Sequence, residues 1–446
     1  MDEKDRVFLI SLGCAKNLVD SEHMLGLLRA KGFPLVSAIY EADTVVINTC
    51  AFIQPAVEES IDTILEAASL KKQGKLRGLV VTGCFVQRYG YKLLKEIPEV
   101  DGWLGTGEIH RIAEVLDEIP RAREPLFFIG RPLYMADHTV PRIQSTPFFS
   151  AYLRIAEGCP HRCAYCLIPS LRGPLRSRTM ASLLEEAQAM VSRGVKEINL
   201  IAQDTTMYGK DLGGKASLET LLERLTQIRG VSWIRLQYAH PHGISERLLD
   251  LIDSEEVICA YIDLPFQHVN QEILTAMGRE IFDESPWQLI KRIRSRGRSI
   301  ALRTTFMVGF PGETEERFAQ LLHFVRLARF ERLGVFAFSP EKGTPAARLA
   351  DQVERQVARK RGEKIMALQS RISRELNQAL VGQTLPVLIE GLSPETDLLL
   401  TGRTATMAPD VDGRVLINKG EGATGQIVPV TIGEAHSYDL VGGIQT

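Results

Sequence analysis

Cys159-Pro160-His161-Arg162-Cys163-Ala164-Tyr165-Cys166 is the stretch that decides how the fold and chemistry of this chain are interpreted. It holds three thiols in one short loop, directly after an apolar segment at 151–156 that is typical of a buried strand. Three thiolates can bind three irons of a four-iron, four-sulfur cluster, which leaves one iron open to a small molecule. A zinc site needs four protein ligands, and His161 is the only other candidate nearby. A cluster is therefore favoured over a structural zinc loop or buried core cysteines.

The spacing of these cysteines, three and then two residues, resembles that of the radical S-adenosylmethionine superfamily. The resemblance implies that the amino and carboxylate groups of S-adenosylmethionine occupy the open iron. It also implies that Tyr165, just before the third cysteine, packs near the adenine.

The totals describe an ordinary globular protein of 446 residues, long enough for about three domains. A net charge of -2 gives no overall electrostatic case for nucleic acid. The charged start, residues 1–6, excludes a secretory signal, and no apolar run is long enough for a membrane span, so a cytoplasmic location is expected. Seven cysteines in a reducing compartment indicate metal binding or catalysis, although Cys259 is interpreted as a core residue.

Residues 1–130 alternate β-rich runs with amphipathic helical segments, which predicts an open parallel α/β sheet. The predicted strands and helices are, respectively, 7–11, 44–48 and 79–82, and 18–30 and 56–70. Cys14, Cys50 and Cys84 each stand just past the carboxyl end of a strand, the edge where ligands bind in open α/β sheets. A second three-cysteine cluster is favoured over coincidence. A flavodoxin-like phosphate site is disfavoured because no Gly-x-Gly-x-x-Gly fingerprint follows any strand.

A proline-containing linker is predicted at 131–147, followed at 148–379 by a partial (βα)6 barrel with a connector helix at its end. Six βα units are fewer than the eight of a closed barrel, so the barrel is expected to be open. The predicted strands are 151–156, 197–202, 233–238, 261–264, 301–308 and 333–338, with helices at 183–192, 218–228, 315–327 and 352–379.

Polar and glycine residues at the carboxyl ends of these strands are candidates to hold the cofactor or the substrate. We select Gln203, Gly309 and Gly312 as cofactor-binding residues. Asp204, Gln267, His268 and Glu313 share the rim, where turn or capping roles are equally good explanations and a structural role is favoured for His268. A second set, Arg172, Arg176 and Arg178, fits either an anion or substrate contact or a solvated basic edge.

The last part, 380–446, has short β runs broken by glycine, proline and Asp-Gly turns, which predicts a small five-stranded barrel of the oligonucleotide-binding kind. Between 379 and 446 there are three basic and eight acidic residues, a balance of 3 minus 8, or -5. A surface of that sign repels phosphate and suits a basic protein partner. The alternative is that these acids only keep the domain soluble.

The whole chain resembles the methylthiotransferases, which combine a three-cysteine amino-terminal domain, a radical S-adenosylmethionine barrel and a terminal TRAM-like small barrel. The runs 11–22 and 156–173 resemble the branch that modifies an aspartate of a small-subunit ribosomal protein. Lys16-Asn17 and Ser170 stand where the transfer-RNA branch more often has methionine-asparagine and tyrosine. The acidic terminal barrel supports the same choice.

The resemblance implies two four-iron, four-sulfur clusters, on Cys14, Cys50 and Cys84 and on Cys159, Cys163 and Cys166, with S-adenosylmethionine on the second. The implied activity adds a methylthio group to the β-carbon of an aspartate in the twelfth small-subunit ribosomal protein. Because cofactors break the C–H bond, no protein general base is expected. An external electron donor is implied, and no membrane partner. The alternatives are methylthiolation of an adenosine in transfer RNA and a non-catalytic iron-sulfur carrier or scaffold.

Overall fold

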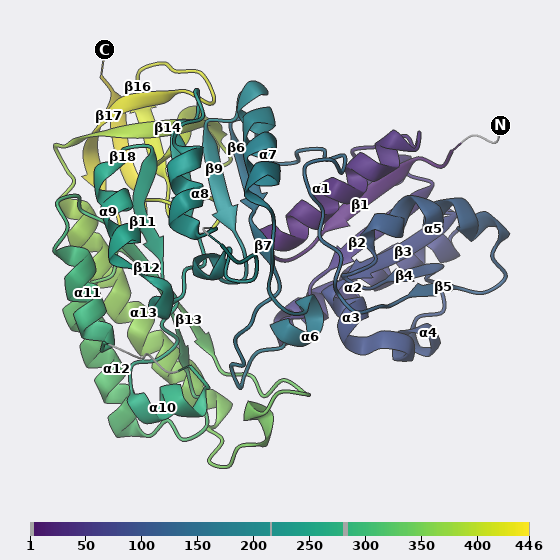
Figure 1. Ribbon diagram of the computed structural model, residues 1–446, viewed down its shortest axis with the longest axis horizontal. Coiled ribbons are helices and arrows are strands. Elements are labelled where there is room, and N and C mark those ends of the chain that lie inside the picture. The colour runs from purple at the N-terminus through teal and green to yellow at the C-terminus, as the bar shows by residue number, and fades with distance from the viewer. Residues whose placement is uncertain (1–3, 215, 280–283, 446) are drawn as a thin grey trace.

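The computed structural model describes residues 4–214, 216–279 and 284–445, so the first three residues of the charged start lie outside the description. A five-stranded sheet, a six-stranded sheet and a closed five-stranded barrel follow one another along the chain. In Figure 1 the amino-terminal sheet forms one lobe, and the other two parts lie together in the second lobe. The predicted three-part α/β and β architecture is confirmed.

The amino-terminal sheet is entirely parallel, and its strands pair in the order in which they occur in the chain. The second and third strands are buried along their whole length, because helices cover both faces of the sheet. Two further strands, each of three residues, went unpredicted because so short a run shows no periodicity. The elements are β1 (Val7–Ser11), α1 (Ala15–Ala30), β2 (Thr44–Thr49), α2 (Gln54–Lys72), β3 (Gly78–Gly83), α3 (Cys84–Tyr89), α4 (Leu93–Glu96), β4 (Gly102–Leu104), α5 (Ile112–Glu118) and β5 (Leu126–Phe128).

The central sheet has six parallel strands in the order β13-β12-β11-β10-β9-β6, and its two edge strands do not pair. The open six-stranded barrel is therefore confirmed. The first predicted strand is shorter than expected, since its last residue, Ala156, belongs to a separate two-stranded ribbon. The elements are β6 (Ser150–Arg154), β7 (Ala156–Glu157), α6 (Ile168–Arg172), β8 (Arg176–Ser177), α7 (Met180–Ser192), β9 (Glu197–Ile201), α8 (Leu218–Leu225), β10 (Trp233–Leu236), α9 (Glu246–Ser254), β11 (Ile258–Asp263), α10 (Gln271–Ala276), α11 (Pro286–Arg294), β12 (Ala301–Val308), α12 (Glu315–Ala328) and β13 (Arg332–Ala337).

The connector helix α13 (Arg355–Gln378) packs its apolar stripe, including Ile365 and Ile372, into the core of the central domain. The barrel that follows is closed, as predicted. Its last strand has glycines at 442 and 443, which hid it from the sequence pattern. The strands are β14 (Thr384–Ser393), β15 (Thr396–Thr404), β16 (Val415–Lys419), β17 (Ile427–Ala435) and β18 (Leu440–Ile444).

The predicted domain limits after 130, 147 and 379 fall outside the helices and strands, and they stay predictions. Residues 131–147 contain no helix or strand, yet they are held firmly. Arg142 in this linker donates hydrogen bonds to Glu22 and Glu186, at 2.8 and 2.6 Å. Cys259 is a buried residue of β11, as expected. Throughout the described residues, every helix is too short or too polar to cross a bilayer.

A buried ionic cluster attaches the carboxy-terminal barrel to the central sheet. Glu197 of β9 accepts hydrogen bonds from Arg235 at 2.9 Å and from Arg403 of β15 at 2.7 Å, and all three side chains are buried. Burial alone would raise the pKa of Glu197, but the two guanidinium groups lower it from 4.5 to about 2. The carboxylate is thus charged in the folded protein across the physiological range.

We expect Glu197→Gln to destabilise the protein by about 3–5 kcal/mol, because it leaves buried Arg235 without a carboxylate and buried Arg403 with only Glu390. The contribution of Glu197 is complete above pH 4.5 and is lost as the pH falls from 4.5 to about 2, since the folded-state pKa is the lower one. Urea unfolding at several pH values measures both effects. Glu395→Gln, at an exposed carboxylate of the same barrel, is the control and should change little. Equal stability of the two variants would contradict the prediction.

Candidate functional site

The three amino-terminal cysteines meet at one rim because their strands are neighbours. Strand order does not reverse in this sheet, so the adjacency of β1, β2 and β3 is what brings Cys14, Cys50 and Cys84 together. Gly13 makes the approach possible. Its φ of +89° favours glycine, and a Cβ there would lie 2.7 Å from the Cys50 Cβ. The predicted grouping of these thiols is therefore present in the structure.

The environment of these thiols suits a metal cluster. Burial, followed by the neighbouring Cys50 and Cys14, raises the pKa of Cys84 to about 12, while Arg172 opposes this shift. Burial likewise raises the pKa of Cys50. Each cysteine is free of a disulfide. Cys14 is exposed, Cys50 half-buried and Cys84 buried, and bound iron would stabilise all three thiolates at once.

The second cysteine loop is held from two sides. The Cys159 amide donates to the Gly173 carbonyl at 3.1 Å, and the Ala164 amide donates to the Met277 carbonyl at 2.8 Å. Burial raises the pKa of Cys159 to about 11 and that of Cys166 to about 12, and in each case nearby cysteines of the loop add to the shift. This loop therefore presents three converging thiols, as the sequence predicts.

One half-buried cation lies beside this loop and was not recognised in the sequence. Arg279 Nη1 is 4.0 Å from the Cys163 sulfur, and its other terminal nitrogen donates to the Pro265 carbonyl at 2.5 Å. A positive charge at this position complements the negative charge of a metal-thiolate cluster held by the loop. Arg279 lies more than a hundred residues beyond the loop, so no local motif indicated it.

Gln203 has the geometry expected of a ligand contact. Its amide nitrogen donates to Glu157 Oε1 at 2.5 Å, which fixes the orientation of the side chain. Its oxygen is buried and has no hydrogen-bond partner among the described residues. An orphaned acceptor beside the cysteine loop fits a bound donor such as an amino group. Tyr165 packs in an apolar cluster with Phe310 and Met307, and burial raises its pKa.

The predicted glycine turn is held in place by contacts within the chain. Gly309 has a φ of +73°, and a Cβ there would lie 2.3 Å from the Ala358 Cβ of α13. Its amide donates to Glu313, and burial raises the pKa of Glu313 to about 7 although Arg361 opposes the shift. Gly312, with a φ of +81°, donates to the Asp351 carbonyl at 2.9 Å. These contacts explain the glycines by packing, and their role in cofactor binding stays a prediction.

The other rim residues make local contacts. Asp204 accepts from the Thr206 amide at 2.9 Å and lies 2.6 Å from His161 Nε2. His268 is fully buried, and its Nδ1 accepts from the Asn270 amide at 3.0 Å. The structural role expected for His268 is thus present. Gln267 has a φ of 67° and pairs with Phe306.

The two cysteine sites are joined by α6. This helix begins two residues after Cys166, and its flank inserts into the other lobe, since Leu167 and Leu171 belong to the hydrophobic core of the amino-terminal domain. Thr106 of that domain donates to the Leu171 carbonyl at 2.6 Å. The segment that follows the second cysteine loop therefore contributes to the amino-terminal core, and Figure 1 shows α6 close to α3.

The prediction of a solvated basic edge at the three arginines after the loop is wrong. At two of the three positions, 172 and 178, the arginine is already paired within the chain and is not free to bind an anion. Arg172 and Arg178 are buried, and each has carboxylate partners within the chain. Arg178 pairs with Glu186, whereas Arg176 is half-buried and donates to the Pro174 carbonyl at 2.8 Å. Asp20, the partner of Arg172, is 152 positions away, and counting charges along the chain does not show which side chains the fold buries.

Arg172 belongs to a buried network that crosses between the lobes. It donates to Asp20 at 2.6 Å and to Asn17 Oδ1 at 2.7 Å, both on α1. Arg154 of β6 pairs with the same Asp20 and lies 3.0 Å from Glu157. Burial would raise the pKa of Asp20, but Arg154 and Arg172 lower it overall. The network therefore fixes α1, next to Cys14, against the cysteine loop.

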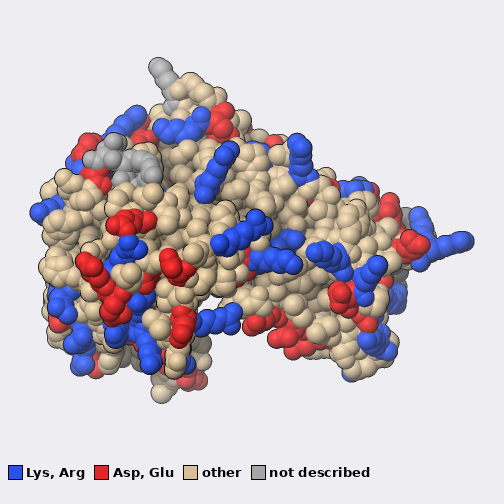
Figure 2. All heavy atoms as spheres, turned by 90° about the horizontal axis from the view of Figure 1, so that it is seen from below, with Lys and Arg blue, Asp and Glu red and all other residues tan. Residues whose placement is uncertain are grey.

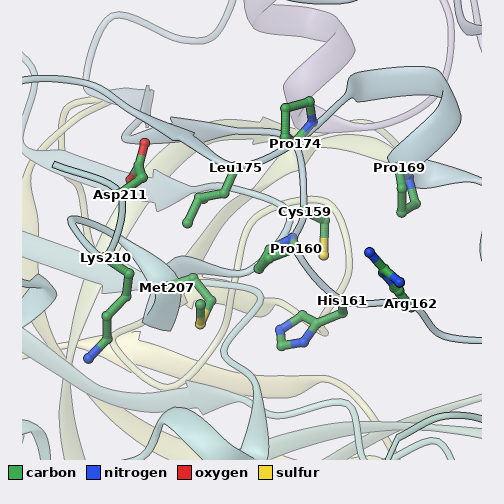
Figure 3. A pocket seen from close by; sticks show the side chains of 10 residues that line it. All are labelled: Cys159, Pro160, His161, Arg162, Pro169, Pro174, Leu175, Met207, Lys210 and Asp211. Atoms are coloured by element: carbon green, nitrogen blue, oxygen red, sulfur yellow. The ribbon is translucent and has the colours of Figure 1, made fainter.

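An open pocket borders the second cysteine loop on its outer side. Figure 3 shows Cys159 in it, with Pro174 and Leu175 on one flank and Met207 and Lys210 on another. Arg162 and Lys210 are exposed there. On the face shown in Figure 2 a notch separates the two lobes, with basic and acidic side chains around it.

Three family descriptions match consecutive parts of the chain: uncharacterized protein family UPF0004 over residues 6–105, the radical SAM superfamily over 153–325 and the TRAM domain over 381–444. Among solved structures, the radical S-adenosylmethionine methyltransferase TsrM from Kitasatospora setae has a TM-score of 0.57 at 14% identity, covering 86% of this chain and 80% of that one. The cobalamin-dependent radical enzyme OxsB has a TM-score of 0.51 at 12% identity, covering 82% and 56%. Both likenesses show the fold alone.

The fold and the cysteine loop together define a radical S-adenosylmethionine enzyme, with an iron-sulfur cluster and S-adenosylmethionine as cofactors. Proteins named ribosomal protein uS12 methylthiotransferase RimO are similar over the full chain. Those of Syntrophotalea carbinolica and Geotalea uraniireducens are each 50% identical, covering 99% of this chain and 97% and 98% of theirs. That of Geobacter sulfurreducens is 49% identical and covers 99% of both. The chain belongs to this methylthiotransferase family.

Arg172→Gln is expected to destabilise the contact between the lobes by about 3–5 kcal/mol, because it leaves buried carboxylates short of a cation. The measurement is urea unfolding, with limited proteolysis of the linker at 131–147 as a second probe. Arg193→Gln, at an exposed arginine after α7, is the control and should behave like the unchanged protein. If both variants resist urea and protease equally, the network does not hold the lobes together.

Proposed function

We propose that the chain adds a methylthio group to the β-carbon of an aspartate in ribosomal protein uS12. The observation that carries this proposal is α6, which begins just after one cysteine triad and packs into the core beneath the other. Two triads held at facing rims suit a reaction that needs two metal sites at one substrate carbon. The names of the full-length relatives specify the ribosomal protein.

Each triad is proposed to hold one four-iron, four-sulfur cluster, and Gln203 and Tyr165 to bind S-adenosylmethionine at the second. When bound, these cofactors supply the radical chemistry, the sulfur and the methyl group. The residues of the chain bind these cofactors and orient them. Gln203 offers its free oxygen to a donor, Tyr165 provides an apolar wall, and the buried network around Arg172 holds both rims in register. No side chain is assigned as a general base.

An external one-electron donor is part of the proposal. The pocket in Figure 3 offers it a route, because Cys159 itself lines that pocket and exposed Arg162 and Lys210 can attract an acidic carrier. The substrate is a ribosomal protein, free or within the ribosomal subunit, so the cytoplasm is the compartment that this function requires.

Transfer RNA is the second candidate substrate, and the charge of the terminal barrel disfavours it. Of the three basic residues counted there, Arg403 is buried against Glu197 and cannot reach a phosphate. The Asp412 side chain is buried too, so the balance without these two groups is 2 minus 7, again -5, a sign that repels phosphate. A non-catalytic electron carrier would leave the orphaned Gln203 oxygen unexplained.

The test compares the unchanged protein with a Cys14→Ala, Cys50→Ala, Cys84→Ala variant after anaerobic reconstitution. The expected iron contents are about eight and about four per chain, because each cluster holds four irons. Both proteins should cleave S-adenosylmethionine when reduced, and only the unchanged one should add a methylthio mass to uS12.

A Cys259→Ala variant is the matched control, since this buried thiol lies away from both triads and should leave iron content and activity intact. About four irons in the unchanged protein would refute the second cluster. A methylthio mass on transfer RNA instead of uS12 would refute the substrate.

Gln203→Ala is expected to weaken S-adenosylmethionine binding about five-fold, which corresponds to one hydrogen bond of about 1 kcal/mol. Calorimetric titration of the reconstituted, unreduced protein measures it. Gln188→Ala, at an exposed glutamine of α7, should bind as the unchanged protein does. Identical affinities for the two variants would remove Gln203 from the cofactor site.

A further inference from the structure

Lys16 is a largely buried residue whose ammonium has no carboxylate partner among the described residues. It lies in the first turn of α1, two residues after Cys14, and retains only 9% of its surface. Its ammonium lies 3.1 Å from the centroid of the Tyr238 ring. Within residues 4–214, 216–279 and 284–445 no hydrogen bond or ion pair to this ammonium is present. A ring face offsets only part of the cost of burying a charge.

The other buried cations near Lys16 are satisfied within the chain. Arg154 and Arg172 share Asp20, and Arg178 pairs with Glu186. Lys16 is the exception in this region, although it is similarly buried. A largely desolvated ammonium with no partner among the described residues is available to an anionic group of a ligand.

The position of Lys16 places that anion between the two lobes. Lys16 belongs to the amino-terminal rim beside Cys14, while Tyr238 follows β10 at the carboxyl edge of the central sheet. Tyr238 has a φ of 58°, an unfavourable region for an aromatic residue, and its amide donates to Asp263 at 3.2 Å. Strained residues of this kind are concentrated at functional sites.

Apolar contacts fix the first turn of α1 against the central sheet. Ala15 and Leu18, on either side of Lys16 in the helix, pack with Tyr152 and Ile201 in one hydrophobic cluster, which Tyr238 also joins. This packing fixes the backbone from which the Lys16 side chain reaches the rim of the central sheet. Its position is preorganised for a ligand.

We propose that Lys16 binds the side-chain carboxylate of the substrate aspartate and so holds the adjacent β-carbon between the two cysteine triads. This inference rests on the proposed function and names its specificity-determining residue. A carboxylate is one bond from the β-carbon, so fixing the carboxylate fixes the carbon. The same contact rejects asparagine, whose neutral amide cannot compensate a buried ammonium.

The test is a double-mutant cycle in binding. The proteins are the unchanged enzyme, Lys16→Met and Lys31→Met, where Lys31 is an exposed lysine just past the end of the same helix. The ligands are uS12 and a uS12 variant with asparagine at the aspartate that the unchanged enzyme modifies, located by mass spectrometry. Dissociation constants are measured with clusters loaded and S-adenosylmethionine present, but without reductant.

The unchanged enzyme and Lys31→Met should bind the asparagine form at least about 30-fold more weakly than uS12, because the ammonium is left buried and unpaired. Lys16→Met should bind both forms within about three-fold of each other. Lys16→Gln repeats the test should the methionine variant fold poorly, as judged by thermal unfolding.

If Lys16→Met still bound uS12 much more tightly than the asparagine variant, the inference would be overturned. A changed iron content or electron paramagnetic resonance signal of the Cys14 triad in the same variant would then make Lys16 a counter-ion of that cluster. Weaker S-adenosylmethionine binding would instead indicate that Lys16 holds the cofactor carboxylate. Failure of the unchanged enzyme to modify uS12 at all would instead refute the proposed function, and this inference with it.

Discussion

The buried ion pairs between α1 and the central domain are the constraint on which the arrangement of the site depends. Asp20 receives two guanidinium groups, from Arg154 and Arg172, in an interior where a single unpaired charge would be costly. Such a network is satisfied only when all its members are in place, so it specifies one relative position of the lobes more sharply than apolar contact could. This network therefore fixes the position of one cysteine triad relative to the other.

A second buried ionic cluster, at the other end of the central sheet, fixes the terminal barrel in the same way. Glu197 of β9 joins Arg235 of the neighbouring strand to Arg403 of the terminal barrel. Hydrogen bonds from Tyr152 to Asp410 and from Tyr261 to Asp412 lie in the same region, at 3.0 and 2.8 Å. The central domain is thus the common body to which the other two attach, each through charges that are buried and paired.

Sequence patterns predicted most of the elements and all six cysteine positions, for physical reasons. Buried parallel strands such as β2 and β3 are continuous apolar runs, and a cysteine that follows such a run is visible without a structure. The short strand β4 and the glycine-containing β18 lack that pattern. The hydrophobic pattern of a segment shows which of its faces is buried, and a segment of three residues is too short to display such a pattern.

The charge partners were not predictable in the same way. Asp20 and Arg172 are 152 positions apart, so only the folded chain reveals that Arg172 and Arg178, two of the three arginines after Cys166, are interior. The isolation of Lys16 was equally hidden, because the absence of a partner can be judged only when all the neighbours are known. Sequence analysis selected the two cysteine triads as candidate ligands, whereas the surrounding charges required three-dimensional information.

Helix α6 belongs both to the second cysteine loop and to the amino-terminal core, and this has a thermodynamic consequence. Its flanking leucines stabilise the amino-terminal core, and its first residue is anchored to the second cysteine loop through the Ile168 amide, 3.4 Å from the Cys166 sulfur. A group that binds only the ordered loop shifts the equilibrium toward the ordered form. Loading of metal and docking of the lobes are then linked steps of maturation, and a chain that has lost its iron is also one whose halves are less firmly assembled.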